Sequence, residues 1–351
     1  MAQPPAWTPP PKPGLIPLAP MTLGVMLGAS FRVLRRNPRP VVGFSLVIHA
    51  VLAIITILVS AVFAANALSK YFTDVSAGAF TTEDLSNLLV AYVGSFVSAA
   101  FTYGGEAILQ GIITQEVARG TLGEKLPLSA LWGRSRGRIL VLVGWAAAEI
   151  GAIFLVAVVL IGAFALLAST GGSAGVAIGV LILVLGILAA LVLGIWIGTR
   201  LSLVPSALIL ERLPLGKAIR RSWGLVRGYF WRTFGIQLLV SVMIGIAASI
   251  AITPFTLIIG VIVGISHPTG ADTAGAAFAS TYTLTQIVTT IVSSLIATIT
   301  AIISTSVTAL IYIDLRIRKE GLDLALMRFV DARQAGNADV PDPYLPTSNP
   351  T

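Results

Sequence analysis

The sequence predicts an all-α, polytopic membrane protein with six transmembrane helices, and three observations lead to this fold class. Of the 351 residues, 56% are hydrophobic and 11% are charged, whereas roughly 25% of the residues in a soluble domain are charged. The hydrophobic residues form six runs that exceed the ~20 residues a helix needs to cross a bilayer. Lys and Arg lie almost entirely on one side of these runs, as expected of cytoplasmic loops.

The two ends of the chain differ in composition from the rest. The first twenty residues contain eight prolines and one cation, Lys12, so they lack the basic start and apolar middle of a signal peptide. We expect residues 1–20 to form a disordered, Pro-rich cytoplasmic tail. Residues 334–351 are expected to form a disordered C-terminal tail, because Asn, Asp, Pro and Ser dominate there. Residues 21–333 then make up the six-helix membrane domain.

Six predicted spans divide the membrane domain. Several exceed the minimum length by about a third, which predicts tilt or kinks, with Pro254 as the expected kink in the fifth. A short polar turn over residues 169–173 makes the third and fourth spans a tight hairpin. The spans are Val41–Asn66, Leu88–Thr114, Ile139–Ala168, Val176–Thr199, Phe234–Ile265 and Thr281–Ile313.

The distribution of cations predicts the orientation. All but one of the 23 Lys and Arg residues lie before the first span, in the loops after the second and fourth, or after the sixth, and the exception is Lys70. Because cations stay in the cytoplasm, both termini are predicted to be cytoplasmic in a bacterial plasma membrane. The net charge of +8 then forms a basic collar that attracts anionic inner-leaflet lipids. No segment is long enough for a soluble nucleic-acid-binding domain.

Three segments that precede the first, third and fifth spans show an internal repeat. Apolar or small residues recur at spacings of four, three and four, which places each set on one helix face. The sets are Leu23, Leu27, Ser30 and Leu34, then Leu128, Trp132, Ser135 and Ile139, then Leu215, Ile219, Ser222 and Val226. Convergence of segments that enter a membrane explains this pattern, and so do three copies of a helix-plus-hairpin unit around a pseudo-threefold axis.

The other faces of these segments are basic. We therefore expect three amphipathic helices, at about residues 22–36, 127–138 and 214–230, lying in the inner membrane interface. Their arginines are candidate contacts for anionic lipids. These residues are Arg32, Arg35, Arg36, Arg134, Arg136, Arg138, Arg220, Arg221 and Arg227.

Two stretches carry a family resemblance. The stretches 210–234 (LERLPLGKAIRRSWGLVRGYFWRTF) and 312–324 (YIDLRIRKEGLDL) resemble the membrane domain attached to some bacterial glycerophosphoryl diester phosphodiesterases and its stand-alone actinobacterial relatives. The resemblance covers residues 21–328 and implies a six-helix membrane architecture. The phosphodiesterase of that family is a separate soluble barrel, so no catalytic residue carries over to this chain.

The end of the sixth span contains opposite charges at i, i+4 spacing. The pairs are Asp314 with Arg318, Arg316 with Glu320, and Lys319 with Asp323. Each pair contributes only about 0.2–0.5 kcal/mol. We expect the helix to continue past the membrane, to pause at Gly321, and to present Leu322, Leu326 and Phe329 for docking against the basic loops or against a partner.

Polar residues within the spans are the remaining candidate site. In the second span Ser95, Thr102, Glu106 and Gln110 share one helix face with Tyr103 beside it, and the third span carries Glu149. Glu106 and Glu149 have similar predicted depth and could face each other. An intramembrane carboxyl is a functional candidate by default, although a hydrogen bond across a helix interface is an equal alternative.

Two further polar features of the spans have structural explanations. Hydroxyls of the sixth span form a stripe that either bonds back to its own helix or lines a conduit. The stripe consists of Gln286, Thr290, Ser293, Thr300, Ser304 and Thr308. His49, in the first span, is expected to form a hydrogen bond at a helix interface, because it has no companion at metal-ligand spacing.

The residue inventory limits the function. Without cysteine and with only two histidines, His49 and His267, the chain has no familiar constellation for metal binding or acid-base catalysis. We predict no enzymatic activity, no cofactor and no metal site. The protein is expected to be a scaffold or accessory membrane component that can contact other membrane proteins. The alternative is a transporter or channel for a small or amphiphilic solute, using the Glu106 and Glu149 region, which would need a water-accessible polar cavity.

Overall fold

The computed structural model describes residues 14–16, 19–63, 82–266, 276–337 and 340–345. Their regular structure is helical throughout, as the sequence predicts, with no strand among the described residues. His267 and most of the outer loops, including Lys70 and Asp272, lie outside this part of the chain.

The described residues in the first half of the chain form helices, most of them long. Helix α1 (Leu23–Arg36) is followed by the π-helical turn η1 (Arg39–Gly43), α2 (Phe44–Phe63) and α4 (Thr82–Thr121). The hairpin of α5 (Leu128–Thr170) and α6 (Gly172–Leu201) turns at Gly171 and Gly172, and Gly172 has a positive φ of 54°. That conformation suits glycine because no Cβ is present to clash.

The second half begins with two short helices. They are α7 (Val204–Leu210) and α8 (Leu215–Val226), and they precede α9 (Phe230–Ser266), which continues through Pro254. The longest helix, α10 (Ala276–Glu320), ends at Gly321, and α11 (Leu322–Gln334) follows. Gly321 adopts a left-handed φ of 65°, and Leu322, Leu326 and Phe329 are buried. The predicted pause and docking helix are thus confirmed.

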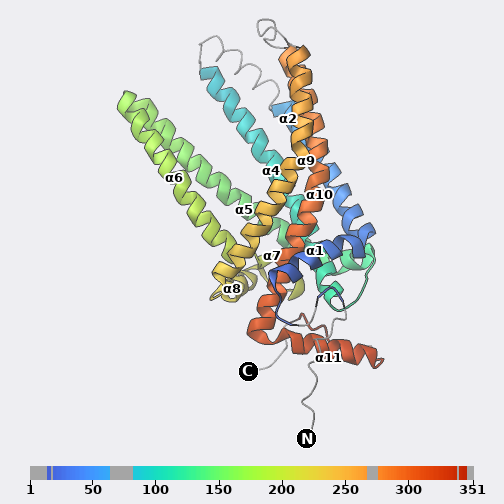
Figure 1. Cartoon of the computed structure of the whole chain (residues 1–351). Helices are drawn as coiled ribbons and strands as arrows, with labels where there is room; N and C mark the ends of the chain where they lie inside the picture. The colour runs from blue at the N-terminus through green and yellow to red at the C-terminus, as the bar shows by residue number, and fades with distance from the viewer. Residues whose placement is uncertain (1–13, 17–18, 64–81, 267–275, 338–339, 346–351) are drawn as a thin grey trace.

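Helix α10 is the centre of the molecule, since it packs against α1, α2, α4, α7, α8, α9 and α11. Helices α1, α8 and α11 gather at one end of the molecule, which we call the basic end, while the α5–α6 hairpin leans away from the other long helices (Figure 1). The buried core is concentrated towards the basic end, where it includes Met26, Leu109, Leu208, Leu310 and Leu326. The opposite halves of the long helices instead expose apolar side chains, as lipid-facing helices do.

Five stretches of the described chain are long and apolar enough to cross a membrane. They are Arg39–Phe63, Leu128–Ser169, Gly172–Leu210, Phe230–Val261 and Thr285–Glu320. The predicted span over residues 88–114 lies within α4, which is not among these five stretches. Glu106 and Gln110 interrupt the apolar run of α4, and this lowers its hydropathy.

The structure differs from the sequence prediction at the amphipathic segments and the tails. Segments one and three form the separate helices α1 and α8, but residues 128–138 are the first turns of α5, with no break before the span. Parts of both predicted tails are packed: Leu15 and Ile16 are buried near the start of the chain, and Tyr344 is buried near its end. The overall composition of these segments is polar or Pro-rich. Composition therefore does not predict that a few of their side chains are buried.

Candidate functional site

A polar pair links α2 and α4 inside the bundle. The His49 Nε2 atom lies 3.1 Å from Oε1 of Glu106, and its Nδ1 atom lies 2.8 Å from the carbonyl oxygen of Ser45 on its own helix. His49 is buried, while the Glu106 side chain is 38% exposed. His49 is therefore the interface hydrogen-bonding residue that the sequence predicts, and its partner is one of the predicted site residues.

The sequence contains a signal for the His49–Glu106 pair as well as for a pair of Glu106 with Glu149. His49 lies eight residues from the inner end of its predicted span, as Glu106 does from the end of the next span. At 1.5 Å per residue the two side chains have the same depth, and adjacent antiparallel helices bring such residues together. Equal depth does not determine which neighbouring helix faces Glu106. The packing of α2 against α4 makes His49 its partner.

The other predicted site residues are not assembled with this pair. Tyr103 is exposed on α4, and Gln110 is half-buried one turn beyond Glu106. Glu149 lies on the exposed side of α5, where its polar neighbour is Trp145 on the same helix. Glu106 and Glu149 thus have different polar partners, so the structure does not bring together the four-residue site predicted from the sequence.

The serine and threonine hydroxyl groups of α10 bond to their own helix where the structure gives them a partner. Thr300 donates to the carbonyl of Ala297 at 3.0 Å, and Thr308 donates to that of Ser304 at 3.0 Å. Thr298 does the same with Ser294. This is the back-bonding that serine and threonine commonly adopt in lipid-embedded helices, and it needs no conduit.

The nine candidate arginines fall into two groups. Four are engaged by the protein itself: Arg32 donates to the carbonyl of Leu15, Arg36 to that of Gly120, Arg138 to that of Arg212, and Arg221 to two carboxylates. Arg35, Arg136, Arg220 and Arg227 are exposed instead, and Arg134 is half-exposed. The exposed group remains available for lipid or ligand, whereas the engaged group mainly holds the basic end together.

A charge cluster joins α8 to α10 and is defined by Glu211, Arg221, Arg316 and Glu320. Arg221 donates to Glu211 at 2.9 Å and to Glu320 at 2.7 Å, and Arg316 bonds Glu320 at 3.1 Å and lies 3.5 Å from Glu211. The Tyr312 hydroxyl also donates to Glu211, which is buried. Burial opposes the charge of Arg221, but the hydrogen bonds to Glu320 and Glu211 outweigh it and raise the Arg221 pKa.

Asp314 ties the start of α1 and the start of α9 to α10. Its carboxylate is only 1% exposed and accepts the Met21 backbone N–H at 2.7 Å. It also accepts from Arg318 at 2.8 Å and Arg232 at 3.1 Å. Two of the three predicted i, i+4 pairs are therefore present, those of Asp314 with Arg318 and of Arg316 with Glu320. In place of the third pair, Lys319 donates to the carbonyl oxygens of Gly224 and Arg227.

The C-terminal segment is fastened to the end of α4. The Tyr344 hydroxyl donates to the carbonyl of Ala118 at 3.0 Å and contacts the Thr121 hydroxyl, while Asp342 pairs with Arg119. The Tyr344 carbonyl accepts from Arg316 at 3.0 Å. Burial raises the pKa of Tyr344 to about 12, and burial lowers the pKa of Arg119.

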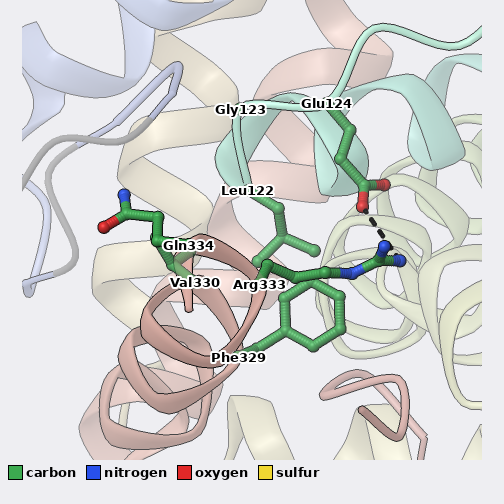
Figure 2. A pocket seen from close by; sticks show the side chains of 7 residues that line it. All are labelled: Leu122, Gly123, Glu124, Phe329, Val330, Arg333 and Gln334. Atoms are coloured by element: carbon green, nitrogen blue, oxygen red, sulfur yellow. Dashed lines mark ion pairs between the residues drawn. The ribbon is translucent and has the colours of Figure 1, made fainter. Parts of the chain in front are cut away.

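Besides an apolar cavity of about 330 Å³ between α1, α9 and α10, the described residues form two cavities with charged residues in their walls at the basic end. The smaller of these two, about 430 Å³, lies between the α4–α5 turn and α11. Figure 2 shows Arg333 passing over the Phe329 ring towards Glu124, and this ion pair is 3.9 Å long. The larger, about 770 Å³, lies between α8 and the end of α10 beside the charge cluster.

The sequence contained an unused signal for these charged contacts. The string Glu-Lys-Leu-Pro-Leu at 124–128 is matched by Glu-Arg-Leu-Pro-Leu at 211–215. In both copies the proline caps the helix that follows, α5 or α8, with nearly the same backbone conformation. In both copies the glutamate pairs with arginines, Glu124 with Arg119 and Arg333, and Glu211 with Arg221 and Arg316.

Within the described residues, no group of three or more His, Cys, Asp or Glu side chains could hold a metal ion. The long apolar helices and the exposed apolar surface define an all-α protein of the multi-pass membrane class. Residues 134–315, from α5 to α10 and slightly more than half of the chain, match a family described as a domain of unknown function (DUF7847). The chain belongs to this family. Neither the curated proteins nor the solved structures provide a match.

Proposed function

We propose that this protein is a non-catalytic scaffold or accessory component of a bacterial plasma membrane. The observation that carries the proposal is the construction of the basic end. Central helix α10 binds α1, α8 and the C-terminal segment there through the buried Asp314, Glu211 and Arg316 side chains. Such an end is a rigid platform on apolar helices, and a platform suits the binding of other proteins.

We further propose six membrane spans with both termini in the cytoplasm. Helix α4 provides the span that is additional to the five apolar stretches, the second in chain order, since it runs for 40 residues and packs against both α2 and α5. Its one ionisable group at mid-depth, Glu106, has a partner in His49, which reduces the cost of placing it in lipid. The cytoplasmic assignment of the basic end rests on the asymmetry of Lys and Arg.

The proposed repeat unit is an inner amphipathic segment followed by two spans, present three times around a pseudo-threefold axis. In each copy the N-cap of the helix lies eight residues before the serine. The N-caps are Thr22, Pro127 and Pro214, and the serines are Ser30, Ser135 and Ser222. All three serines are buried. Ser135 donates to Gly111 of α4 and Ser222 to Arg200 of α6, in each case the last span of the preceding unit.

The packing of α1 fits the same cyclic scheme. Helix α1 lies against α10, the last span of the third unit, as α5 lies against α4 and α8 against α6. In the second unit the amphipathic segment and the first span form one continuous helix, α5, whereas in the other two units they are separate helices. The resemblance to the membrane domain of glycerophosphoryl diester phosphodiesterases is part of the proposal, with the fold as the shared property and no catalysis implied.

Anionic inner-leaflet lipids are the proposed immediate partners of the exposed arginines. The side chains of Arg35 on α1, Arg136 on α5, and Arg220 and Arg227 at α8 are exposed and form no hydrogen bond or ion pair with the described residues. Each such cation near an anionic leaflet contributes about 1 kcal/mol.

Purification from native membranes in a gentle detergent tests the scaffold proposal. A scaffold should retain a membrane-protein partner in fixed stoichiometry, measured by quantitative mass spectrometry. Leu324, an exposed apolar residue of α11, is a place to disturb such a contact: Leu324→Glu should release the partner, and Leu181→Ala, on the exposed face of α6, should retain it. Recovery of the protein alone, together with solute flux in liposomes, would overturn the proposal.

A transporter is the second candidate, and the His49–Glu106 pair favours it. Two ionisable side chains that share a hydrogen bond across two helices, with one of them 38% exposed, resemble the proton-handling pairs of carriers. Proteoliposome flux of small solutes, driven by a proton gradient and lost in Glu106→Gln, would replace the scaffold proposal with this one.

A further inference from the structure

We propose that the cavity between α8 and the end of α10 is a binding site for a phosphate group. Its volume of about 770 Å³ lies within the range typical of small-molecule sites. Five cations line it: Lys217, Arg220, Arg221, Arg316 and Lys319. Two acids, Glu211 and Glu320, are also in its wall, so the lining carries a net positive charge.

The acids are already neutralised by arginines of the wall. Glu211 is held by Arg221 and Arg316, and the same two arginines hold Glu320. These contacts fix the two guanidinium groups in place, and the Tyr344 carbonyl fixes Arg316 from behind. The charge of the wall is therefore preorganised, which lowers the entropic cost of binding an anion.

The remaining cations supply the attraction. Lys319 is anchored by hydrogen bonds to the carbonyl oxygens of Gly224 and Arg227, yet its charge has no carboxylate partner within ion-pair distance among the described residues. Lys217 and Arg220 are exposed on α8, one turn apart, and make no hydrogen bond or ion pair with the part of the chain described. Helix geometry places residues three apart on the same face, so both side chains can close on one anion at the mouth of the cavity.

Phosphate is the anion that this arrangement fits. Arg220 can bind two phosphate oxygens through its planar fork, while Lys217 and Lys319 act as point charges. A phosphate can come from a soluble phosphorylated compound or from the headgroup of a phospholipid, and an open cavity at the inner membrane surface is accessible to both.

The experiment uses the full-length protein and two probes. In the first arm, inorganic phosphate is titrated into protein in a neutral detergent, with chloride as background anion, and binding is measured by calorimetry. In the second arm, the protein is reconstituted in phosphatidylcholine nanodiscs with or without phosphatidylglycerol, and retained phosphatidylglycerol is counted by native mass spectrometry.

The test variant is Lys217→Gln with Arg220→Gln, which removes the two exposed cations without breaking a contact. The matched control is Lys125→Gln with Arg328→Gln, which removes one exposed lysine and one exposed arginine that do not line the cavity. Because a charge-assisted hydrogen bond contributes about 1.5–3 kcal/mol, we expect the test variant to bind at least about tenfold more weakly than the wild type. The control should stay within about twofold, since exposed charges interact weakly at a distance.

The two arms identify the source. Saturable phosphate binding that only the test variant loses supports a site for a soluble phosphate compound, and phosphatidylglycerol retention that only the test variant loses supports a headgroup site. Absence of saturable binding in both arms overturns the proposal. So does an equal loss in test and control variants, because that result assigns the affinity to the overall basic charge. Neither result bears on partner retention, which tests the scaffold proposal separately.

Discussion

His49 and Glu106 satisfy each other, so the effect of substitution depends on what replaces the carboxyl group. Glu106→Ala leaves the buried His49 Nε2 atom without its partner, and we expect it to lower the free energy of unfolding by about 1–3 kcal/mol. Glu106→Gln retains a hydrogen-bonding group of the same size and should cost less than about 1 kcal/mol. Thermal unfolding in detergent, followed by tryptophan fluorescence, measures both.

Glu149→Gln is the matched control for this pair, because Glu149 is exposed on α5 and has no described contact with another helix. The Glu149→Gln variant should unfold at the same temperature as the wild type. A Glu106→Ala variant as stable as Glu149→Gln would show that the His49 contact contributes nothing to folding.

Tyr344 should make the docking of the C-terminal segment sensitive to alkaline pH. Its folded pKa of about 12 lies above the ordinary value of about 10, so only the neutral phenol is compatible with the buried site. The stabilisation is therefore fully present below pH 10 and is lost as the pH rises through about 12. Spectrophotometric titration of the wild type should include an ionisation near pH 12 from Tyr344, in addition to the signal of the other tyrosines, among them the buried Tyr312.

Tyr344→Phe tests the assignment of that tyrosine. It removes the hydroxyl contacts with Ala118 and Thr121, at a cost of about 1 kcal/mol, but keeps the ring packed. The ionisation near pH 12 should be absent while that of the other tyrosines is unchanged, and protease cleavage of the C-terminal segment should no longer increase steeply with pH. Persistence of the ionisation near pH 12 in this variant would assign it to another residue.

At the scale of elements, the break between α10 and α11 depends on one backbone conformation. Gly321 has a φ of 65°, which a side chain disfavours by about 1–2 kcal/mol. Gly321→Ala should destabilise the protein by that amount and loosen α11 first, because α11 holds Leu326 and Phe329 in the core only in this orientation. Hydrogen exchange of α11 amides is the direct measurement.

Gly216→Ala provides the comparison, since an added Cβ there meets nothing within 4 Å and the backbone is helical. Alanine in a helix is more favourable than glycine by about 0.5–1 kcal/mol, so this variant should be neutral or more stable. Equal destabilisation of both variants would show that the positive φ of Gly321 is not the cause of the effect.

The elements were predictable to the extent that their causes are local. Hydropathy located the long helices, and i, i+4 charges together with Gly321 predicted the end of α10 and the docking of α11. The continuity of α5 was not predictable, because the apolar and basic faces of residues 128–138 are typical of a separate interfacial helix, whereas in the structure this segment packs against α4 as part of one continuous helix. The burial of Leu15 and Tyr344 depends on partners more than a hundred residues away, which no local pattern contains.

The candidate site shows the same limit. Depth arithmetic gives Glu106 nearly the same predicted depth as His49 and Glu149, and the choice between these two partners depends on which neighbouring helix faces Glu106. The charge cluster around Arg221 was not predictable for another reason. Its contacts join α8 to α10, and no rule of sequence spacing links residues of these two helices.

At the scale of the whole molecule, the proposed orientation is open to a direct test. The chain has no cysteine, so an introduced thiol is unique. Ser173→Cys, exposed in the α5–α6 turn, should react with an impermeant thiol reagent on intact cells, whereas Ser129→Cys, exposed at the start of α5, should react only after permeabilisation.

Ser206 would be unsuited to such labelling because it is buried in α7. Labelling of Ser129→Cys from outside intact cells would reverse the orientation and would place the basic end, with its cavity, on the outer face.

The hydrogen bond from Met21 to Asp314 spans 293 residues of sequence, and this has a consequence for biosynthesis. The ribosome synthesises α1 first and Asp314, whose carboxylate accepts the Met21 N–H, almost last. The amphipathic helix α1 therefore lacks this contact until all spans have been inserted. Throughout that interval Met21 lacks its final neighbour, as does the end of α4 that Tyr344 later covers, whereas the partner of Leu15, Gly120, is synthesised much earlier. Closure of long loops is slow. Chaperone protection of the nascent chain should therefore concentrate on residues 14–36 and end only when translation does.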